Sequence, residues 1–124
     1  MTASQFRRIA LGMEGAIESA HMGHPDFRAN GRIFATLKGD DRHGMVKLTP
    51  EQQQAFVQDH PKAFAPESGA WGRQGCTRVV LKEADPEVIG EAMTLAWRAA
   101  QAHGSRPTAR RSRLDARRKP QASR

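Results

Sequence analysis

Apolar and polar residues alternate through residues 22–48, on both sides of the pair Asn30-Gly31. Two adjacent residues that readily adopt positive φ, flanked by alternating positions, are the strongest short-range signal of a β-hairpin. The alternation resumes after a turn at residues 39–44, and this predicts a third strand. The chain is therefore expected to be built around a three-stranded antiparallel meander.

Helices are predicted on both sides of the meander. Thr2 and Thr49 each precede a Gln by three residues, which is the spacing of a capping box, so helices are expected over residues 3–11 and 50–59. Residues 86–104 carry apolar side chains at helical intervals. This third helix is expected to cover the sheet with its apolar stripe.

The remaining segments complete one domain. Residues 16–22 and 76–82 are predicted strands, residues 63–66 a short extended piece, and residues 68–75, with three glycines, a loop. This order of elements predicts an α+β, two-layer single domain, in which helices pack on one face of an antiparallel sheet. The residues expected together in its core are Ile33, Leu37, Val46, Val79, Leu81, Ile89, Met93 and Trp97.

The net positive charge of the chain is confined to its C-terminal end. The 124 residues carry a formal charge of +7, and residues 105–124 contain eight basic residues and one acid. Residues 1–104 are therefore formally neutral, and we expect them to form the domain. Because Leu114 is the one large apolar residue beyond it, residues 105–124 are predicted to be a disordered basic tail.

Hydropathy and cysteine usage bear on the compartment. No run is apolar enough for a membrane span, and the first residues lack the apolar segment of a secretory signal. The single cysteine, Cys76, has no partner for an internal disulfide. These features predict a cytoplasmic protein without a membrane partner.

Several strings in the chain form a recognisable signature. They are HMGHPDFR at residues 21–28, GRIFATL at 31–37, MVKLTPEQ at 45–52, and the pairs Trp71-Gly72 and Ala96-Trp97. Together they closely resemble the MmcQ/YjbR family of small bacterial proteins. The resemblance implies a compact α+β fold like that of frataxin-type and secretion-chaperone domains. It also implies a DNA-binding role that uses two hairpin wings.

His21, His24 and Asp26 raise the question of a metal site. Residues three apart on one extended strand point to opposite faces, and no further His or Cys follows at usable spacing. No Ser lies in a nucleophile-elbow pattern, and Cys76 falls within a predicted strand. We therefore expect no bound metal, no cofactor and no catalytic residue. The segment His24-Pro25-Asp26 is expected to be a turn at a strand end.

Trp71 lies in the glycine-rich segment and has two interpretations. It is either an exposed platform for base stacking or binding, or a side chain that packs over the edge of the sheet. We group it with His24 and Asp26 as candidate surface anchors. Trp97, in contrast, lies on an apolar helical stripe and is expected in the core.

Basic residues near the predicted hairpins are candidate contacts to phosphate. In the domain they are Arg28, Arg32, Lys38, Lys47, Arg73 and Arg78. In the tail they are Arg110, Arg111, Arg113, Arg117, Arg118 and Lys119. The alternative interpretations are an ordinary mixed-charge surface for the domain and a solubilising extension for the tail.

These features favour a non-enzymatic DNA-binding protein of the MmcQ/YjbR type, which contacts phosphate through hairpin wings and a cationic tail. The contrasting class is a protein-interaction or chaperone-like module that binds a peptide or client protein on its sheet. Nuclease treatment separates the two classes, because only a protein client would remain bound afterwards.

Overall fold

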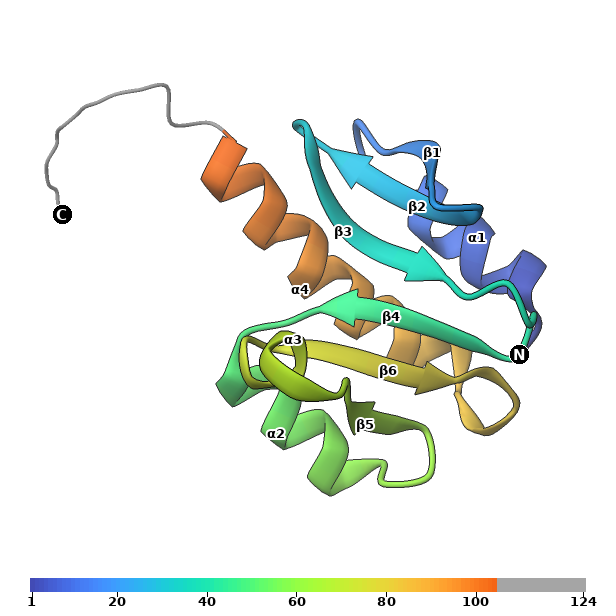
Figure 1. Ribbon diagram of the computed structural model, residues 1–124, viewed down its shortest axis with the longest axis vertical. Coiled ribbons are helices and arrows are strands. Elements are labelled where there is room, and N and C mark those ends of the chain that lie inside the picture. Colours follow the sequence, from blue (N-terminus) through green and yellow to red (C-terminus); the bar gives the residue numbers. More distant parts are fainter. Residues whose placement is uncertain (105–124) are drawn as a thin grey trace, which may run out of the picture.

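The computed structural model describes residues 1–104 as one sheet with helices packed against it (Figure 1). The strands are β1 (Ile17–His21), β2 (His24–Ala29), β3 (Arg32–Leu37), β4 (His43–Lys47), β5 (Phe64–Pro66) and β6 (Cys76–Val80). They form a six-stranded sheet in the order β1-β2-β3-β4-β6-β5, and every neighbouring pair is antiparallel. The predicted α+β fold class is confirmed. The predicted disorder of the tail lies outside the described residues.

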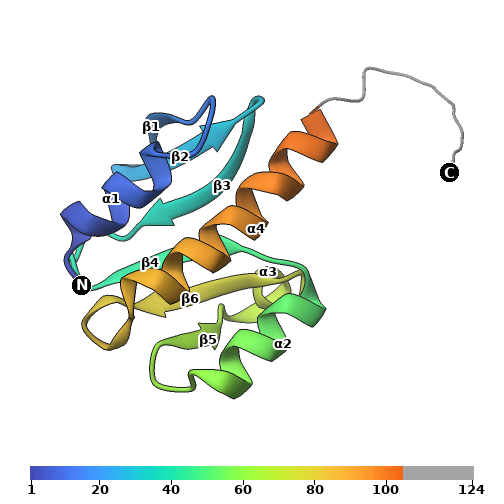
Figure 2. The same ribbon diagram turned by 180° about the vertical axis from the view of Figure 1, so that it is seen from behind.

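The helices divide between the two faces of this sheet. They are α1 (Ala3–Leu11), α2 (Pro50–Asp59), α3 (Gly69–Arg73) and α4 (Pro86–Gly104), with a short 3-10 turn at Leu81–Glu83. The three predicted helices, α1, α2 and α4, lie on one face, which is turned toward the viewer in Figure 2. Apart from α3 near one end, the opposite face is left uncovered by helices, as Figure 1 shows.

Local signals produce the helix starts and the first turn of the meander. The Thr2 side chain accepts a hydrogen bond from the Gln5 backbone, and the Gln5 side chain accepts one from Thr2. The same reciprocal pair forms before α2, where proline occupies the first turn. Asn30 and Gly31 have φ values of 57° and 80°, as a tight hairpin requires. These predictions are confirmed.

The core lies between the sheet and the three predicted helices. Phe27, Ala35, Val46 and Thr77 are in register across four strands, and all are fully buried. The predicted core residues that are buried are Leu37, Val46, Val79, Leu81, Ile89 and Met93. Trp97 is only partly buried, because its Nε1 donates a 2.7 Å hydrogen bond to the Glu14 carbonyl oxygen at the surface.

Ile33 does not belong to the core face, and the reason is a β-bulge. Phe27 pairs with Ala35 and Arg28 pairs with Ile33, so Phe34 is an extra residue in β3. Phe34 and Ala35 are neighbours in the chain, yet both are fully buried. After this extra residue the alternation continues, with Thr36 outward and Leu37 in the core. A strict period of two therefore assigned Ile33 to the wrong face.

Two further predictions are corrected near β6. The predicted loop at residues 68–75 contains α3, whose tight turn brings Gly72 against the chain before it; a Cβ at Gly72 would lie 1.7 Å from the Glu67 carbonyl oxygen. The predicted strand at residues 76–82 ends at Val80, and Leu81 begins a 3-10 turn. Leu81 is still buried because the turn keeps its side chain in the core.

Candidate functional site

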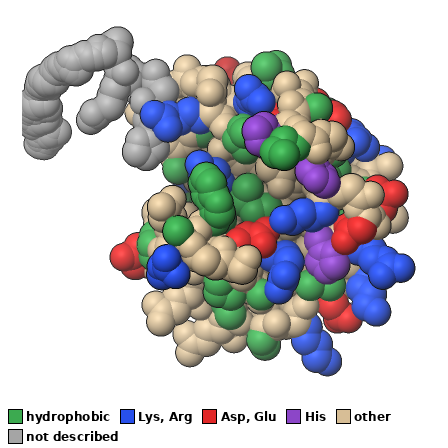
Figure 3. Space-filling model, viewed as in Figure 1, with side chains coloured by type: hydrophobic (Ala, Val, Ile, Leu, Met, Phe, Trp, Pro, Cys, Tyr) green, Lys and Arg blue, Asp and Glu red, His purple; other side chains and the backbone are tan. Residues whose placement is uncertain are grey.

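The face of the sheet that is turned away from α1 and α4 carries polar and basic side chains. Thr36, Met45 and Arg78 are in register across β3, β4 and β6. Their neighbours along the strands point into the core, so alternation directs these three outward. In Figure 3, Lys, Arg and His side chains gather on this face, over the middle of the sheet, with hydrophobic and a few acidic side chains among them.

A hollow of about 560 Å³ lies on this open face. Its lining residues are His21, Ile33, Thr36, Lys38, Met45, Lys47, Glu67, Ser68, Trp71 and Cys76. They come from β1, β3, β4, β6 and the segment around α3, so tertiary structure brings together residues far apart in the sequence. We call this site the open-face hollow.

Trp71 stands at this hollow on α3 and is 66% exposed. The helix that carries it is held tightly: the buried Gln53 side chain donates to the carbonyl oxygens of Gly72, at 3.0 Å, and Cys76, at 2.9 Å. Burial over the sheet edge, one of the two interpretations of Trp71, is therefore wrong. The indole is an exposed aromatic surface on a fixed support.

The charges at the hollow are partly compensated. Lys38 Nζ lies 3.1 Å from Glu67 Oε2, and this oxygen is buried without an aligned hydrogen bond, so the ion pair is its main compensation. Among residues 1–104, no carboxylate pairs with Lys47 or with the exposed Arg78. These two side chains therefore give this part of the face a positive charge that can attract an anionic ligand.

Arg28 is engaged by a carboxylate. Its Nε and a terminal nitrogen donate to the two carboxylate oxygens of Asp26 at 2.8 and 3.1 Å, and Asp26 is 1% exposed. The hydrogen bond and the charge of Asp26 raise the pKa of Arg28. Two of the donors that Arg28 would offer to phosphate or to a base are thus already used.

The predicted turn at His24-Pro25-Asp26 is wrong. These residues begin β2, and the turn is formed by Met22 and Gly23, with φ values of 53° and 81°. His21 and His24 therefore face each other across a hairpin instead of lying on opposite faces of one strand. Within the described 104 residues, no group of three or more His, Cys, Asp or Glu side chains is placed to hold a metal ion.

The other predicted basic residues are dispersed. Arg32 lines an adjoining hollow of about 300 Å³ beside Ala96 and Ala100 of α4. This hollow shares Ile33, Lys47 and Cys76 with the open-face hollow, which Arg32 does not line. Arg73 ends α3 and is exposed. The six predicted basic residues of the tail lie outside the described residues. The structure thus brings Lys38, Lys47 and Trp71 to one hollow and leaves Arg32 and Arg73 outside it.

Sequence reasoning missed several lining residues. Met45 alternates with the buried Val46, so strict alternation predicts its outward direction. The bulge in β3 moved Ile33 away from its predicted face. Ser68 lay in a segment expected to be a loop, and Glu67 fell between two predicted segments. Cys76, expected to be a strand residue, lines the hollow while mostly buried, and this burial raises the pKa of its thiol.

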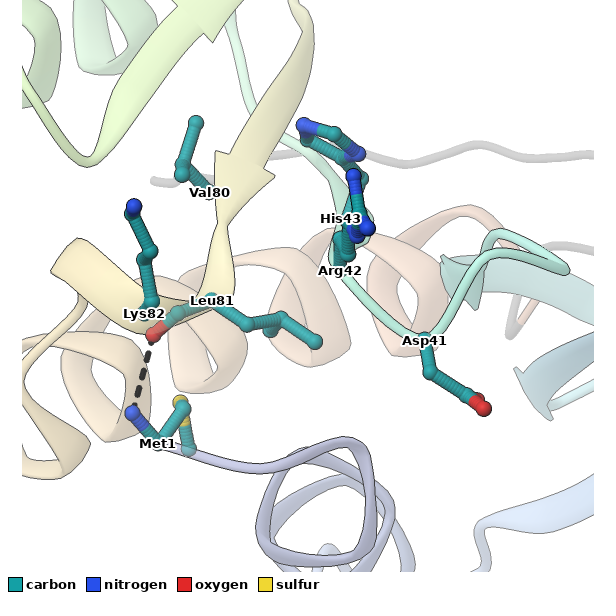
Figure 4. A pocket seen from close by; sticks show the side chains of 7 residues that line it. All are labelled: Met1, Asp41, Arg42, His43, Val80, Leu81 and Lys82. Atoms are coloured by element: carbon teal, nitrogen blue, oxygen red, sulfur yellow. Dashed lines mark hydrogen bonds between the residues drawn. The ribbon is translucent and has the colours of Figure 1, made fainter.

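A second hollow, of about 610 Å³, lies at the end of β6 (Figure 4). The amino group of Met1 donates a 2.9 Å hydrogen bond to the Leu81 carbonyl oxygen there. Asp41 and Arg42 approach from the β3–β4 turn, and in the view their side chains point away from each other. Opposite charges and no exposed aromatic ring make it a weaker candidate than the open-face hollow.

Fold and site define a small α+β protein whose sheet is covered by helices on one face and open on the other. Residues 11–99 match the model of the YjbR family, and the chain belongs to this family. The resemblance found in the sequence is confirmed.

Known structures support the same fold. The crystal structure of Deinococcus radiodurans protein DR2400, described as a DUF419 domain, is similar with a TM-score of 0.66 and 18% identity, over 86% of this chain and 89% of that chain. At this identity the likeness concerns the fold alone. Among curated proteins no match is found. None of the helices within residues 1–104 combines the length and the apolar character needed to cross a bilayer.

Proposed function

We propose that this YjbR-family protein binds DNA without catalysing a reaction, and that it contacts phosphate with cations of the open sheet face and with its basic tail. The observation that carries the proposal is that Lys47 and Arg78 lie on an uncovered sheet face beside the exposed Trp71. Cations without a carboxylate partner attract phosphate, and such contacts supply most of the sequence-independent affinity for DNA.

The proposal assigns the hairpin tips a smaller part than the resemblance implied. Arg28 lies near the Asn30-Gly31 turn, but its guanidinium already donates two hydrogen bonds to the Asp26 carboxylate. Arg32 is on the side of α4. The tail adds a formal charge of +7, which is a sequence-independent source of attraction to polyanions.

A binding role is favoured over catalysis by the state of the thiol at the hollow. Cys76 is buried, and the raised pKa keeps it protonated at neutral pH, whereas the thiolate is the nucleophilic form. We also propose a cytoplasmic location, which the lone cysteine supports, since it has no partner for an internal disulfide.

Fluorescence anisotropy with a labelled random duplex tests the proposal. If four tail cations contact phosphates, log affinity falls against log salt with a slope near −3.6, which is roughly a hundredfold loss between 50 and 200 mM salt. Truncation after Gly104 should remove most of this affinity. Absence of duplex binding by the full chain at 50 mM salt would refute DNA as the ligand.

A paired set of variants separates the open face from the tail. Lys47→Ala/Arg78→Ala in the full chain should weaken binding and lower the slope by about 1 to 2. The matched control, Lys82→Ala/Arg98→Ala, removes the same charge outside the hollow, and Arg98 lies on α4, on the other side of the sheet. Equal effects of the two double variants would show that the open face makes no dedicated contact.

The second candidate is a protein-interaction module, and one observation favours it. Trp71, Ile33 and Met45 give the hollow an apolar part that would suit a side chain of a peptide. A pull-down with the full chain in which a client survives nuclease treatment, and is lost with Trp71→Ala, would support this candidate.

A further inference from the structure

We propose that the open-face hollow holds an unpaired base of single-stranded nucleic acid, stacked on Trp71, with Lys47 and Arg78 beside the adjoining phosphates. This inference rests on the proposed DNA-binding function and names the form of nucleic acid that this site takes.

The two tryptophans of the chain differ in a way that points to a ligand. The indole of Trp97 is partly buried, and its nitrogen donates to the Glu14 carbonyl oxygen. The indole of Trp71 is 66% exposed and makes no hydrogen bond within residues 1–104. Large aromatic side chains normally bury most of their area, so an exposed indole beside a hollow is typical of a binding surface.

The support of Trp71 is rigid, which lowers the entropy cost of stacking. Gly72, the next residue, packs so closely on Glu67 that a Cβ has no room, and Gln53 holds its carbonyl oxygen. The platform is therefore ordered before a ligand arrives.

The rest of the hollow suits a base. Its volume of about 560 Å³ falls in the range of small-ligand sites, roughly 300 to 1,000 Å³. Ile33 and Met45 provide apolar contact for a ring. The Ser68 side chain makes no hydrogen bond to cap α3, so its hydroxyl can serve the polar edge of a base.

Charge favours an anionic ligand over a neutral or cationic one. The negative charge of Glu67 is met by Lys38 at 3.1 Å. Lys47 lines the hollow and Arg78 lies beside Met45 in the register, and neither pairs with a carboxylate in the described part of the chain. The basic side chains at the hollow therefore outnumber the one acidic side chain there, which suits a phosphate backbone.

Single strands fit this site better than a duplex. In a duplex both faces of every internal base are already stacked on neighbouring bases, so Trp71 cannot reach a ring face without unstacking. An unpaired base offers its face freely, and stacking of this kind tolerates any sequence. The expected ligand is thus single-stranded DNA or RNA without strong sequence preference.

The test uses the full chain with Trp97→Phe, which leaves Trp71 as the one tryptophan. Titration with oligothymidine should quench its fluorescence to saturation. Trp71→Ala should weaken binding of labelled oligothymidine by about 5- to 100-fold, the usual effect of losing one stacked base, while Trp71→Phe should retain most of the affinity. Lys47→Ala should lower the salt slope for single strands by about 0.7.

Controls exclude general loss of structure or of apolar surface. Leu11→Ala removes a side chain that is 39% exposed on α1, on the helix side of the sheet, and should leave oligothymidine binding unchanged. Thermal unfolding of each variant must coincide with that of the parent chain. The same measurements with a duplex of equal length give the reference for binding through the tail.

The outcomes separate the two proposals. One outcome is that the chain binds duplex, Trp71 fluorescence does not change, and Trp71→Ala binds oligothymidine as tightly as its parent. This outcome would overturn the single-strand inference and leave the DNA-binding proposal standing. Failure to bind either nucleic acid would overturn both. Saturable quenching by an apolar peptide but not by oligothymidine would assign the hollow to a protein partner and overturn the inference as well.

Discussion

The two faces of the sheet differ in what covers them. On the helix side, Phe27, Ala35, Val46 and Val79 are fully buried in the core. On the open side, Met45 and Lys47 alternate with these residues along β4 but line a hollow at the surface. One strand thus contributes to the core with one set of positions and to the candidate site with the other.

This difference separates stability from binding. Apolar area removed from water stabilises a fold by about 25 cal/mol per Å², so the helix side supplies most of the stability. Surface side chains of the open face contribute little to it and are available to a ligand. Substitutions on the two faces should therefore have different consequences.

The largest expected effect is on the helix side. Ile89→Ala and Leu81→Ala each remove fully buried side chain and should lower the free energy of unfolding by about 2 to 5 kcal/mol. On the open face, Lys47→Ala should change it by less than about 0.5 kcal/mol. Chemical denaturation measures both. Losses below about 0.5 kcal/mol at both buried sites would contradict the assignment of the core face.

The next effect concerns the support of Trp71. In Gly72→Ala the new Cβ would lie 1.7 Å from the Glu67 carbonyl oxygen, which is backbone and cannot move aside cheaply. We expect a loss of about 1 to 3 kcal/mol in unfolding free energy, with a changed Trp71 emission in Trp97→Phe chains. An unaltered emission maximum and unaltered stability would show that the chain around Gly72 and Glu67 has room for a methyl group.

A smaller effect of opposite sign is expected on α4. Gly90 lies inside this helix, and a Cβ there would meet no atom within 4 Å. Because glycine in a helix interior is less favourable than alanine, Gly90→Ala should raise the free energy of unfolding by about 0.5 to 1 kcal/mol. Chemical denaturation of Gly90→Ala and Gly72→Ala under the same conditions compares the two changes in unfolding free energy directly. Destabilisation by Gly90→Ala would indicate closer packing of α4 on this side.

The smallest effect lies in the turn between β3 and β4. The backbone N–H of Arg42, followed by the His43 side chain, lowers the pKa of Asp40 to about 2. Since the folded pKa is depressed, the carboxylate stabilises the fold fully above its unfolded pKa, near 4, and this stabilisation is lost as the pH falls through about 2.

Two measurements check this prediction. NMR titration of the Asp40 carboxyl should give a pKa of about 2. Asp40→Asn should be less stable than the parent chain at pH 6, and the difference should shrink below about pH 4 and vanish only below about pH 2. A difference independent of pH would mean that the carboxylate charge is not responsible.

Several elements could be predicted because their signals are local. The capping boxes at Thr2 and Thr49 and the hairpin at Asn30-Gly31 each depend on residues within a few positions of one another. The family signature and the α+β order follow from the same short segments. Neighbouring residues determine backbone geometry of this kind whatever lies farther away.

The errors arose where distant segments decide. Phe34 is buried as a bulge because β2 and β3 pair with one extra residue, which periodicity does not encode. Residues 69–73 form a helix and not a loop. In this helix Gly72 packs directly against the backbone of Glu67, which only a residue without a side chain can do. Residues 24–26 form a strand and not the predicted turn, because β1 pairs with β2 up to His24.

The sequence by itself determined the family, the fold class, the start of each principal helix and the concentration of the net charge in residues 105–124, since these are properties of composition and short-range order. Only the tertiary structure decided that Trp71 is exposed, that Arg28 is engaged, and that Lys47 and Trp71 meet at one hollow. Exposure and proximity depend on which strands become neighbours, and in this sheet β4 pairs with β6, across the whole segment that contains α2, β5 and α3.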